Sequence, residues 1–194
     1  FVTDNPLTLL VDEDGGLDAP IGIAFGADGN LYVASSGTDE IKRYQGPGGG
    51  TPGAYIGNFV TAGAGGVNLP AGIRFDGLGR LLVASLLTNQ VLRYTAGGAF
   101  DAVLVAAGSG GLSFPDDLAF GPAGNLFVSS RGTDQVLAYD EVTGTFLGVY
   151  AHRPLGFDNP IGLAYGPAGS PSLKMGAFDS DIIRIAGAQN VGIV

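Results

Sequence analysis

The chain has 194 residues, enough for one domain with a sizeable core and short for two. Glycine (35) and proline (11) are abundant, yet 45% of the residues are hydrophobic and lie in short runs, which favours a folded core with many turns. No apolar run reaches the ~20 residues that span a bilayer, so we expect no membrane span. The net charge of −9 disfavours nucleic acid as a partner. With no Cys and one His, disulfides, thiolate ligands and multi-His metal sites are excluded within one chain.

Four copies of one sequence pattern follow each other along the chain. They begin at about residues 17, 67, 112 and 157, and each repeats a proline at the same offset: Pro20, Pro70, Pro115 and Pro160. The first interval is longer than the other two because the Gly- and Pro-rich stretch 45–53 forms a lengthened loop. The sequence therefore predicts a single domain, residues 1–194, built of repeats.

Each copy predicts three strands and a looser fourth strand before the next copy. In the first copy, residues 21–25 alternate bulky and small side chains, residues 26–30 supply Gly, Asp and Asn for a tight turn, and residues 31–34 are apolar on both faces. Thr38-Asp39 marks the next turn, and a third strand follows at 41–44. We expect an all-β chain of four-stranded antiparallel sheets with no long helix. The residues expected to be buried are Ile23, Phe25, Leu31, Val33, Ile73, Phe75, Leu118, Phe120, Leu163 and Tyr165.

The core pattern P-x-G-[IL]-A-[FY]-G-x-x-G-N-L-[FY]-V-[AS], followed by T-[DN]-x-[IV], resembles the NHL-repeat family of β-propellers and extends over all four copies. A period of about 45 residues is also that of a four-stranded propeller blade. The resemblance implies a β-propeller whose relatives usually have six blades and act mainly as interaction platforms. A more distant similarity to gluconolactonase-like propellers implies a metal held by acidic and amide residues in the channel. Similarity to streptogramin-lyase-like propellers implies a His with a Glu.

The two ends of the chain bear on whether the blades close into a ring. Residues 1–16 align with the fourth strand that precedes each copy, so Leu7–Val11 could pair with Ile182–Ile185 and complete the fourth blade. Such pairing would remove an exposed sheet edge. Alternatively, residues 190–194 form that fourth strand, and the chain is an arc of a larger ring.

Three charged residues interrupt the first strands of the second and third copies. Arg74 stands where the other copies have Ala, Asp117 where they have Gly, and Asp116 where they have Ile or Ala. First strands line the channel of a propeller, so these residues predict a site for a polar ligand, or for calcium, which prefers carboxylate oxygens. The alternative is an ion pair between Arg74 and Asp117, whose removal would cost about 1 kcal/mol or less. His152, the only imidazole, lies in a predicted loop on the same side and is a candidate general base.

The remaining polar clusters favour structural roles. Residues 12–15 (Asp-Glu-Asp-Gly) could bind calcium but lack the oxygen spacing of a calcium loop, which favours a solvated loop. The recurring turn residues Asp39, Asn89, Asp134 and Asp181 are expected to bond local backbone. The recurring Tyr44, Tyr94 and Tyr139 are expected to pack between blades. We therefore expect no cofactor, with calcium as the alternative.

Three hypotheses for function remain. The first is a non-catalytic interaction module whose rim loops bind a protein, a glycan or another copy of the chain. The second is a hydrolase or lyase that uses Arg74, Asp116, Asp117 and His152 in the channel. The third is a structural subunit whose open edges join other copies. Few general acids, bases or metal ligands converge in the sequence, which favours the first hypothesis. A charged fraction of only 14% favours an extracellular or periplasmic location.

Overall fold

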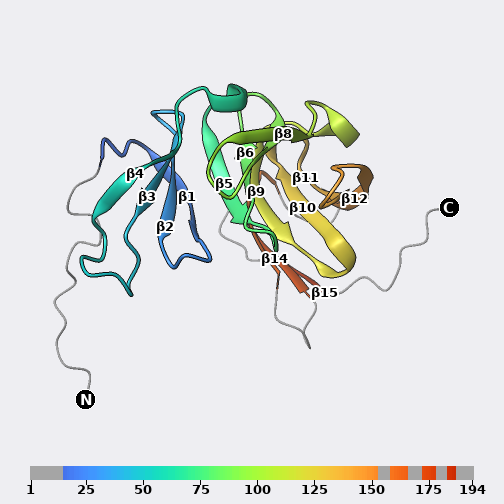
Figure 1. Cartoon of the computed structure of the whole chain (residues 1–194). Helices are drawn as coiled ribbons and strands as arrows, with labels where there is room; N and C mark the ends of the chain where they lie inside the picture. The colour runs from blue at the N-terminus through green and yellow to red at the C-terminus, as the bar shows by residue number, and fades with distance from the viewer. Residues whose placement is uncertain (1–14, 153–157, 166–171, 178–182, 187–194) are drawn as a thin grey trace, which may run out of the picture.

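The computed structural model describes residues 15–152, 158–165, 172–177 and 183–186 (Figure 1). This part of the chain holds fifteen strands and four 3₁₀ turns of three residues each: η1 (Ala64–Gly66), η2 (Ser109–Gly111), η3 (Pro122–Gly124) and η4 (Arg131–Thr133). None of these helical turns has the length or the apolar character to cross a membrane. The prediction of an all-β chain is confirmed.

The strands form four antiparallel sheets that follow the four sequence copies, and we number them blades 1 to 4. Blades 1 to 3 each have four strands in chain order, from an inner to an outer strand, which confirms the prediction for these copies. Blade 1 comprises β1 (Pro20–Phe25), β2 (Leu31–Ser35), β3 (Glu40–Tyr44) and β4 (Tyr55–Val60). Blade 2 comprises β5 (Pro70–Phe75), β6 (Leu81–Ser85), β7 (Gln90–Tyr94) and β8 (Phe100–Val105). Blade 3 comprises β9 (Pro115–Phe120), β10 (Asn125–Ser130), β11 (Gln135–Asp140) and β12 (Phe146–His152).

Blade 4 departs from the prediction of a fourth four-stranded sheet. It shows three strands in the described residues: β13 (Pro160–Tyr165), β14 (Ser172–Ala177) and β15 (Ile183–Ala186). Both segments predicted as its fourth strand, 7–11 and 190–194, lie outside the described residues, and so does the predicted pairing of Leu7–Val11 with Ile182–Ile185.

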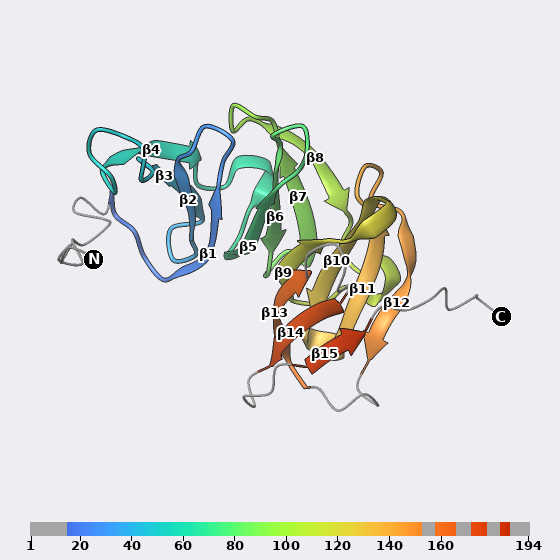
Figure 2. The ribbon, with the colours of Figure 1, turned by 90° about the horizontal axis from the view of Figure 1, so that it is seen from below.

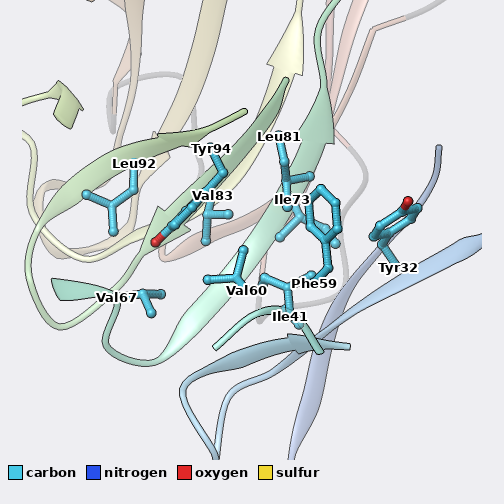
Figure 3. Packing of buried hydrophobic residues seen from close by; sticks show 11 residues of the cluster. Tyr32, Ile41, Phe59, Val60, Val67, Ile73, Leu81, Val83, Leu92 and Tyr94 are labelled. Carbon is cyan, nitrogen blue, oxygen red and sulfur yellow. The ribbon is translucent and has the colours of Figure 1, made fainter. Parts of the chain in front are cut away.

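Successive blades pack face to face. We call the face that carries Tyr32 and Phe59 in blade 1 the trailing face, and the face that carries Ile73 and Phe75 in blade 2 the leading face. Figure 3 shows the core between these two blades, which holds Tyr32 and Phe59 of blade 1 and Ile73 of blade 2. Phe75 packs against this core, and its ring lies 4.8 Å from that of Tyr32 and 6.2 Å from that of Phe59, both edge to face. Similar clusters join blade 2 to blade 3 and blade 3 to blade 4. Burial of these apolar faces is the main stabilising contribution to the stack.

The four sheets form an open arc. Blade 1 and blade 4 lie at opposite ends of the arc and do not pack against each other in the described residues (Figure 2). The inner strands β1, β5, β9 and β13 are successive neighbours on the concave side. Of the two predicted arrangements, the arc is therefore observed rather than the closed ring.

The open end explains where the burial prediction was wrong. Ile23 and Phe25 of β1 are 60% and 58% exposed, whereas Ile73, at the register position of Ile23, is fully buried. No blade precedes blade 1 in the described part of the chain, so its leading face has no trailing face to pack against. The expected burial of Val33, Ile73, Leu118 and Leu163 is confirmed, and Leu31, Phe75, Phe120 and Tyr165 are half-buried.

Recurring polar side chains tie each blade to the next. Asp39, Asn89 and Asp134 have left-handed backbone with φ of 57°, 56° and 53°, and their carboxylate or amide oxygens accept hydrogen bonds from the backbone N–H of Leu69, Phe114 and Asn159 at 2.6, 2.7 and 2.9 Å. Tyr44, Tyr94 and Tyr139 are fully buried. The hydroxyls of Tyr94 and Tyr139 donate to the carbonyls of Ala64 and Ser109. The turn side chains thus have a structural role, but they bond the backbone of the next blade and not local backbone as expected; Asp181 lies outside the described residues. Tyr94 and Tyr139 pack between blades as expected. Tyr44 instead lies on the leading face of blade 1 and contacts Tyr55 of the same blade.

Candidate functional site

The four inner strands line a central pocket of about 230 Å³ on the concave side of the arc. Among the described residues, charged side chains enter this pocket from blades 2 and 3, while β1 and β13 contribute apolar side chains and glycine. The lining residues are Ile21, Gly22 and Ile23 of β1, Gly72 and Arg74 of β5, Asp116 and Asp117 of β9, and Ile161 of β13. Arg74, Asp116 and Asp117, predicted from sequence as interruptions of the inner strands, thus lie at one place.

Glycine at one register position of the inner strands lets neighbouring blades approach. A Cβ atom on Gly22 would overlap the carbonyl oxygen of Ala71 in the next blade, and one on Gly72 would lie 2.6 Å from the Cα of Asp117. Blade 3 has Asp117 in place of glycine at this position, and the side chain of Asp117 reaches toward blade 4. The sequence departure from glycine therefore creates a carboxylate at the junction of three blades.

The carboxylate of Asp117 is hydrogen-bonded on both oxygens. Oδ2 accepts a hydrogen bond from Nη2 of Arg74 in blade 2 at 3.0 Å and from the backbone N–H of Leu163 in blade 4 at 2.9 Å. Oδ1 accepts one from the backbone N–H of Leu118 at 2.8 Å. Arg74 also donates Nη1 to the carbonyl oxygen of Ile73 at 2.8 Å. Burial raises the pKa of Asp117, while Arg74 and the two backbone donors act in the opposite direction. The sequence expectation that Arg74 and Asp117 approach each other in the channel is confirmed.

Asp116 belongs to a second ion pair at the same pocket. Its Oδ2 lies 3.1 Å from Nη1 of Arg131, which comes from the η4 turn of the same blade. The side chain of Asp116 is 10% exposed, and burial raises its pKa to about 6, with Asp117 adding to the rise and Arg131 opposing it. Each carboxylate of the pocket is therefore matched with a guanidinium.

His152 is not part of this pocket. The prediction of a loop at His152 is wrong: the residue is exposed at the last position of the outer strand β12, paired in register with Gln135 of β11. Outer strands lie on the far side of a blade from the inner strand, so the imidazole does not converge with Asp116 and Asp117.

The described residues contain no group of three or more His, Cys, Asp or Glu side chains placed to hold a metal ion. A calcium ion between Asp116 and Asp117 would have to replace Arg74 and Arg131 as the partners of these carboxylates. Residues 12–14 of the acidic cluster lie outside the described part of the chain.

Arg131 and Ser129 were missed by the sequence reasoning. Arg131 stands where the first two copies have Ser36 and Leu86, so it introduces a charge into the turn after the second strand. Asp116 lies in the same copy, and this coincidence could have identified Arg131 as its partner. Ser129 lies at the position of Ala34 and Ala84, and its hydroxyl accepts a hydrogen bond from the backbone N–H of Asp117 at 2.8 Å.

A second pocket, of about 300 Å³, lies on one rim between blades 2 and 3. We call it the rim pocket; it is formed by the β5–β6 turn and the β11–β12 turn, with lining residues Asp76, Gly77, Leu78, Arg80, Glu141 and Val142. Leu78 and Val142 are 74% and 58% exposed. Arg80 is paired with Asp76 at 2.7 Å, and the carboxylate of Glu141 makes no hydrogen bond or ion pair within the described residues.

No protein-family model matches the chain, and no curated protein matches it in sequence. The fold is nevertheless similar to solved structures. It resembles the computationally designed Ika4 protein (TM-score 0.61, 15% identity, 92% of this chain and 98% of that chain) and a chain of a nidogen/laminin complex (0.67, 20%, 83% and 57%). It also resembles virginiamycin B lyase from Staphylococcus aureus (0.58, 15%, 86% and 55%).

At these identities the similarity shows the fold, which is β-propeller-like. The chain spans little more than half of the nidogen/laminin and lyase chains and nearly all of the designed chain.

Proposed function

We propose that this chain is a non-catalytic interaction module of the NHL-like propeller type that binds a protein partner through its rim. The observation that carries the proposal is the contrast between the two pockets. In the central pocket Asp116 and Asp117 each have an arginine partner, whereas the rim pocket has two exposed apolar side chains and the carboxylate of Glu141. Exposed apolar residues beside a concave, partly polar surface are typical of protein-binding sites.

The rim pocket favours a partner segment with an apolar side chain next to a lysine or arginine. Leu78 and Val142 offer contact to the apolar side chain, and Glu141 offers a counter-charge to the basic one. The net charge of −9 would also speed the approach of a basic partner.

Two structural neighbours support a protein partner and an extracellular location. One is part of a nidogen/laminin complex, and another is the extracellular domain of BT4673 from B. thetaiotaomicron (TM-score 0.63, 16% identity, 88% of this chain and 25% of that chain). A glycan or another copy of the chain is the alternative partner within this proposal.

The channel-site hydrolase or lyase is the second candidate, favoured by the presence of one buried and one partly buried carboxylate, those of Asp116 and Asp117, at a pocket. It requires a reactive group without a competing partner, and the pairing of Asp117 with Arg74 and of Asp116 with Arg131 argues against this role. His152, the candidate general base, is on an outer strand.

An array of immobilised short peptides tests the proposal, with Leu or Phe placed beside Lys or Arg, and matched peptides in which Asp replaces the basic residue. We expect the wild type to retain basic-apolar peptides, and Leu78→Asp to weaken that binding by about 10-fold or more. Leu87→Asp is the matched control: it makes the same exchange at a leucine that is 50% exposed on the opposite rim. This variant should bind the peptides as the wild type does.

Equal binding by wild type and Leu78→Asp would overturn the rim site. A thermal-shift screen with divalent cations and sugar acids addresses the enzyme alternative. A stabilisation of the wild type by one of these ligands that is absent in Asp117→Gly would favour the channel-site reading over the interaction module.

A further inference from the structure

An arginine recurs on the third strand of blades 1 and 2, and blade 2 shows what a guanidinium at this position binds. Arg93 pairs in register with Leu82, and its Nε lies 2.6 Å from Oδ2 of Asp101, the bulge residue of the outer strand β8. Its Nη1 donates to the carbonyl oxygen of Val142 in the next blade at 3.0 Å. The partners of this arginine are therefore one carboxylate and one backbone carbonyl.

Arg43 of blade 1 is the equivalent residue, paired in register with Tyr32, and it lacks both kinds of partner. Ile56 stands at the bulge position of Asp101. Among the described residues no carboxylate lies within ion-pair distance of Arg43 and no carbonyl accepts a hydrogen bond from it. Its Nε is buried without a hydrogen-bond partner, which sets it apart from every other buried side-chain nitrogen or oxygen in this part of the chain.

The polar groups of blade 1 near Arg43 already have partners. Arg43 acts electrostatically on the hydroxyl of Tyr32 and on the carboxylate of Asp28. That hydroxyl donates to Oδ2 of Asp28 at 2.9 Å, and the same carboxylate accepts two hydrogen bonds from Asn30. The charge of Arg43 is thus offset at longer range, without a direct ion pair.

The surface around Arg43 combines a cation with an apolar side chain. Arg43 is half-buried, and because its Nε is the buried end of the guanidinium, Nη1 and Nη2 form the end that a ligand can reach. Ile56, beside it in the bulge of β4, is 43% exposed. Two nitrogens of a guanidinium match the two oxygens of a carboxylate, and the exposed isoleucine offers contact to an apolar neighbour.

We propose that Arg43 and Ile56 form a second binding site, on the trailing face of blade 1, for a peptide segment that carries an Asp or Glu side chain next to an apolar one. The contact of Arg93 with Asp101 and Val142 is the template for this site, since a partner would supply from outside the groups that the chain itself supplies in blade 2. The inference goes beyond the rim pocket and does not rest on it, because the two sites share no residue.

Fluorescence anisotropy with labelled peptides tests the site at about 0.15 M salt, where charges more than about 8 Å away are largely screened. The probe is an acetylated and amidated Ala/Gly peptide that contains Leu-Asp, compared with the same peptide containing Leu-Asn. We expect the wild type to bind the Leu-Asp peptide about 10-fold more tightly, and Arg43→Gln to lose this preference. The Leu-Asn peptide with a free C-terminal carboxylate should bind as weakly as its amidated form.

Ile56→Asp tests the same site with the arginine in place. It puts a carboxylate at the position of Asp101, which should pair with Arg43 and weaken binding of the Leu-Asp peptide by about 10-fold. Arg93→Gln is the matched control, because it removes the same charge from the equivalent position and should bind this peptide as the wild type does. Circular dichroism of each variant should match that of the wild type.

Equal affinity of the wild type for the Leu-Asp and Leu-Asn peptides would overturn the inference. Unchanged binding in both Arg43→Gln and Ile56→Asp would do so too, and so would an equal loss in Arg93→Gln or tight binding of the free C-terminal carboxylate. None of these outcomes bears on the binding of basic-apolar peptides at the rim pocket, so this inference and the proposed function fail or stand separately.

Discussion

Replacement of Asp117 by Gly, the residue that the other three copies carry at this position, measures what the carboxylate contributes to stability. The change removes the hydrogen bonds that Arg74, Leu118 and Leu163 donate to it. Hydrogen bonds to a charged group contribute about 1.5–3 kcal/mol each when buried, and they are not additive. Because Arg74 is 31% exposed, water compensates part of the loss. We therefore expect the free energy of unfolding to fall by about 2–4 kcal/mol.

This value exceeds the limit of about 1 kcal/mol that the sequence predicted for an exposed ion pair, since the structure shows the carboxylate also bound to two backbone N–H groups. Asp117→Asn retains an acceptor oxygen and should cost about half as much. The assay is urea unfolding at neutral pH and one fixed protein concentration, followed by circular dichroism, with m-values compared between variants. Glu141→Gln is the control and should lie within about 0.5 kcal/mol of wild type. A cost of Asp117→Gly below about 0.5 kcal/mol would refute the bridging role.

Three further predictions concern Asp116 and the contacts between blades. Burial raises the pKa of Asp116 to about 6, above its ordinary 3.8, so the folded state binds the carboxyl proton of Asp116 more tightly than the unfolded state does. The contribution of Asp116 to the free energy of unfolding therefore falls as pH rises from about 4 to 6. Asp116→Asn should therefore gain about 2 kcal/mol relative to wild type between pH 4 and pH 7 in urea unfolding; a constant difference would contradict this. Tyr94→Phe should cost about 1 kcal/mol by the same assay, through loss of the bond to Ala64, and no cost would show that this bond is unimportant. Asn89→Gly should lower the free energy of unfolding less than Asn89→Ala does, because glycine tolerates the left-handed backbone at this position. The reverse order would contradict the assigned turn geometry.

The sequence predicted the repeated part of the fold because one pattern, read four times, specifies the same local structure each time. Period-two alternation in 21–25 and the turn glycines identified strands and hairpins correctly, and Gly29, Gly79 and Gly124 have the expected positive φ of 76°, 74° and 76°. The same pattern could not reveal which copy lies at an open end. Ile23 and Ile73 occupy equivalent positions, and their different exposure depends only on the presence of a preceding blade.

For the candidate site, the sequence predicted the charged residues of the pocket but not the groups that bind them. Charges that interrupt a repeat located Arg74, Asp116 and Asp117 in one pocket, because equivalent positions in a repeat protein lie on one surface. Their partners were harder to predict. The backbone N–H of Leu163 has no sequence signature, and the pairing of Asp116 with Arg131 depends on how the η4 turn folds back toward β9.

We propose that the carboxylates of the central pocket have a structural role, with arginine and backbone donors as their partners, and do not bind a ligand. Carbon-13 NMR of aspartate labelled at the side-chain carboxyl observes Asp116 and Asp117 directly, with Asp116→Asn and Asp117→Asn used to assign the two signals. We expect Asp116 to titrate near pH 6 and Asp117 to titrate above the ordinary value, and we expect millimolar calcium to change neither signal. A calcium-dependent shift of both signals, with a fall in both pKa values, would show that the two carboxylates bind the ion.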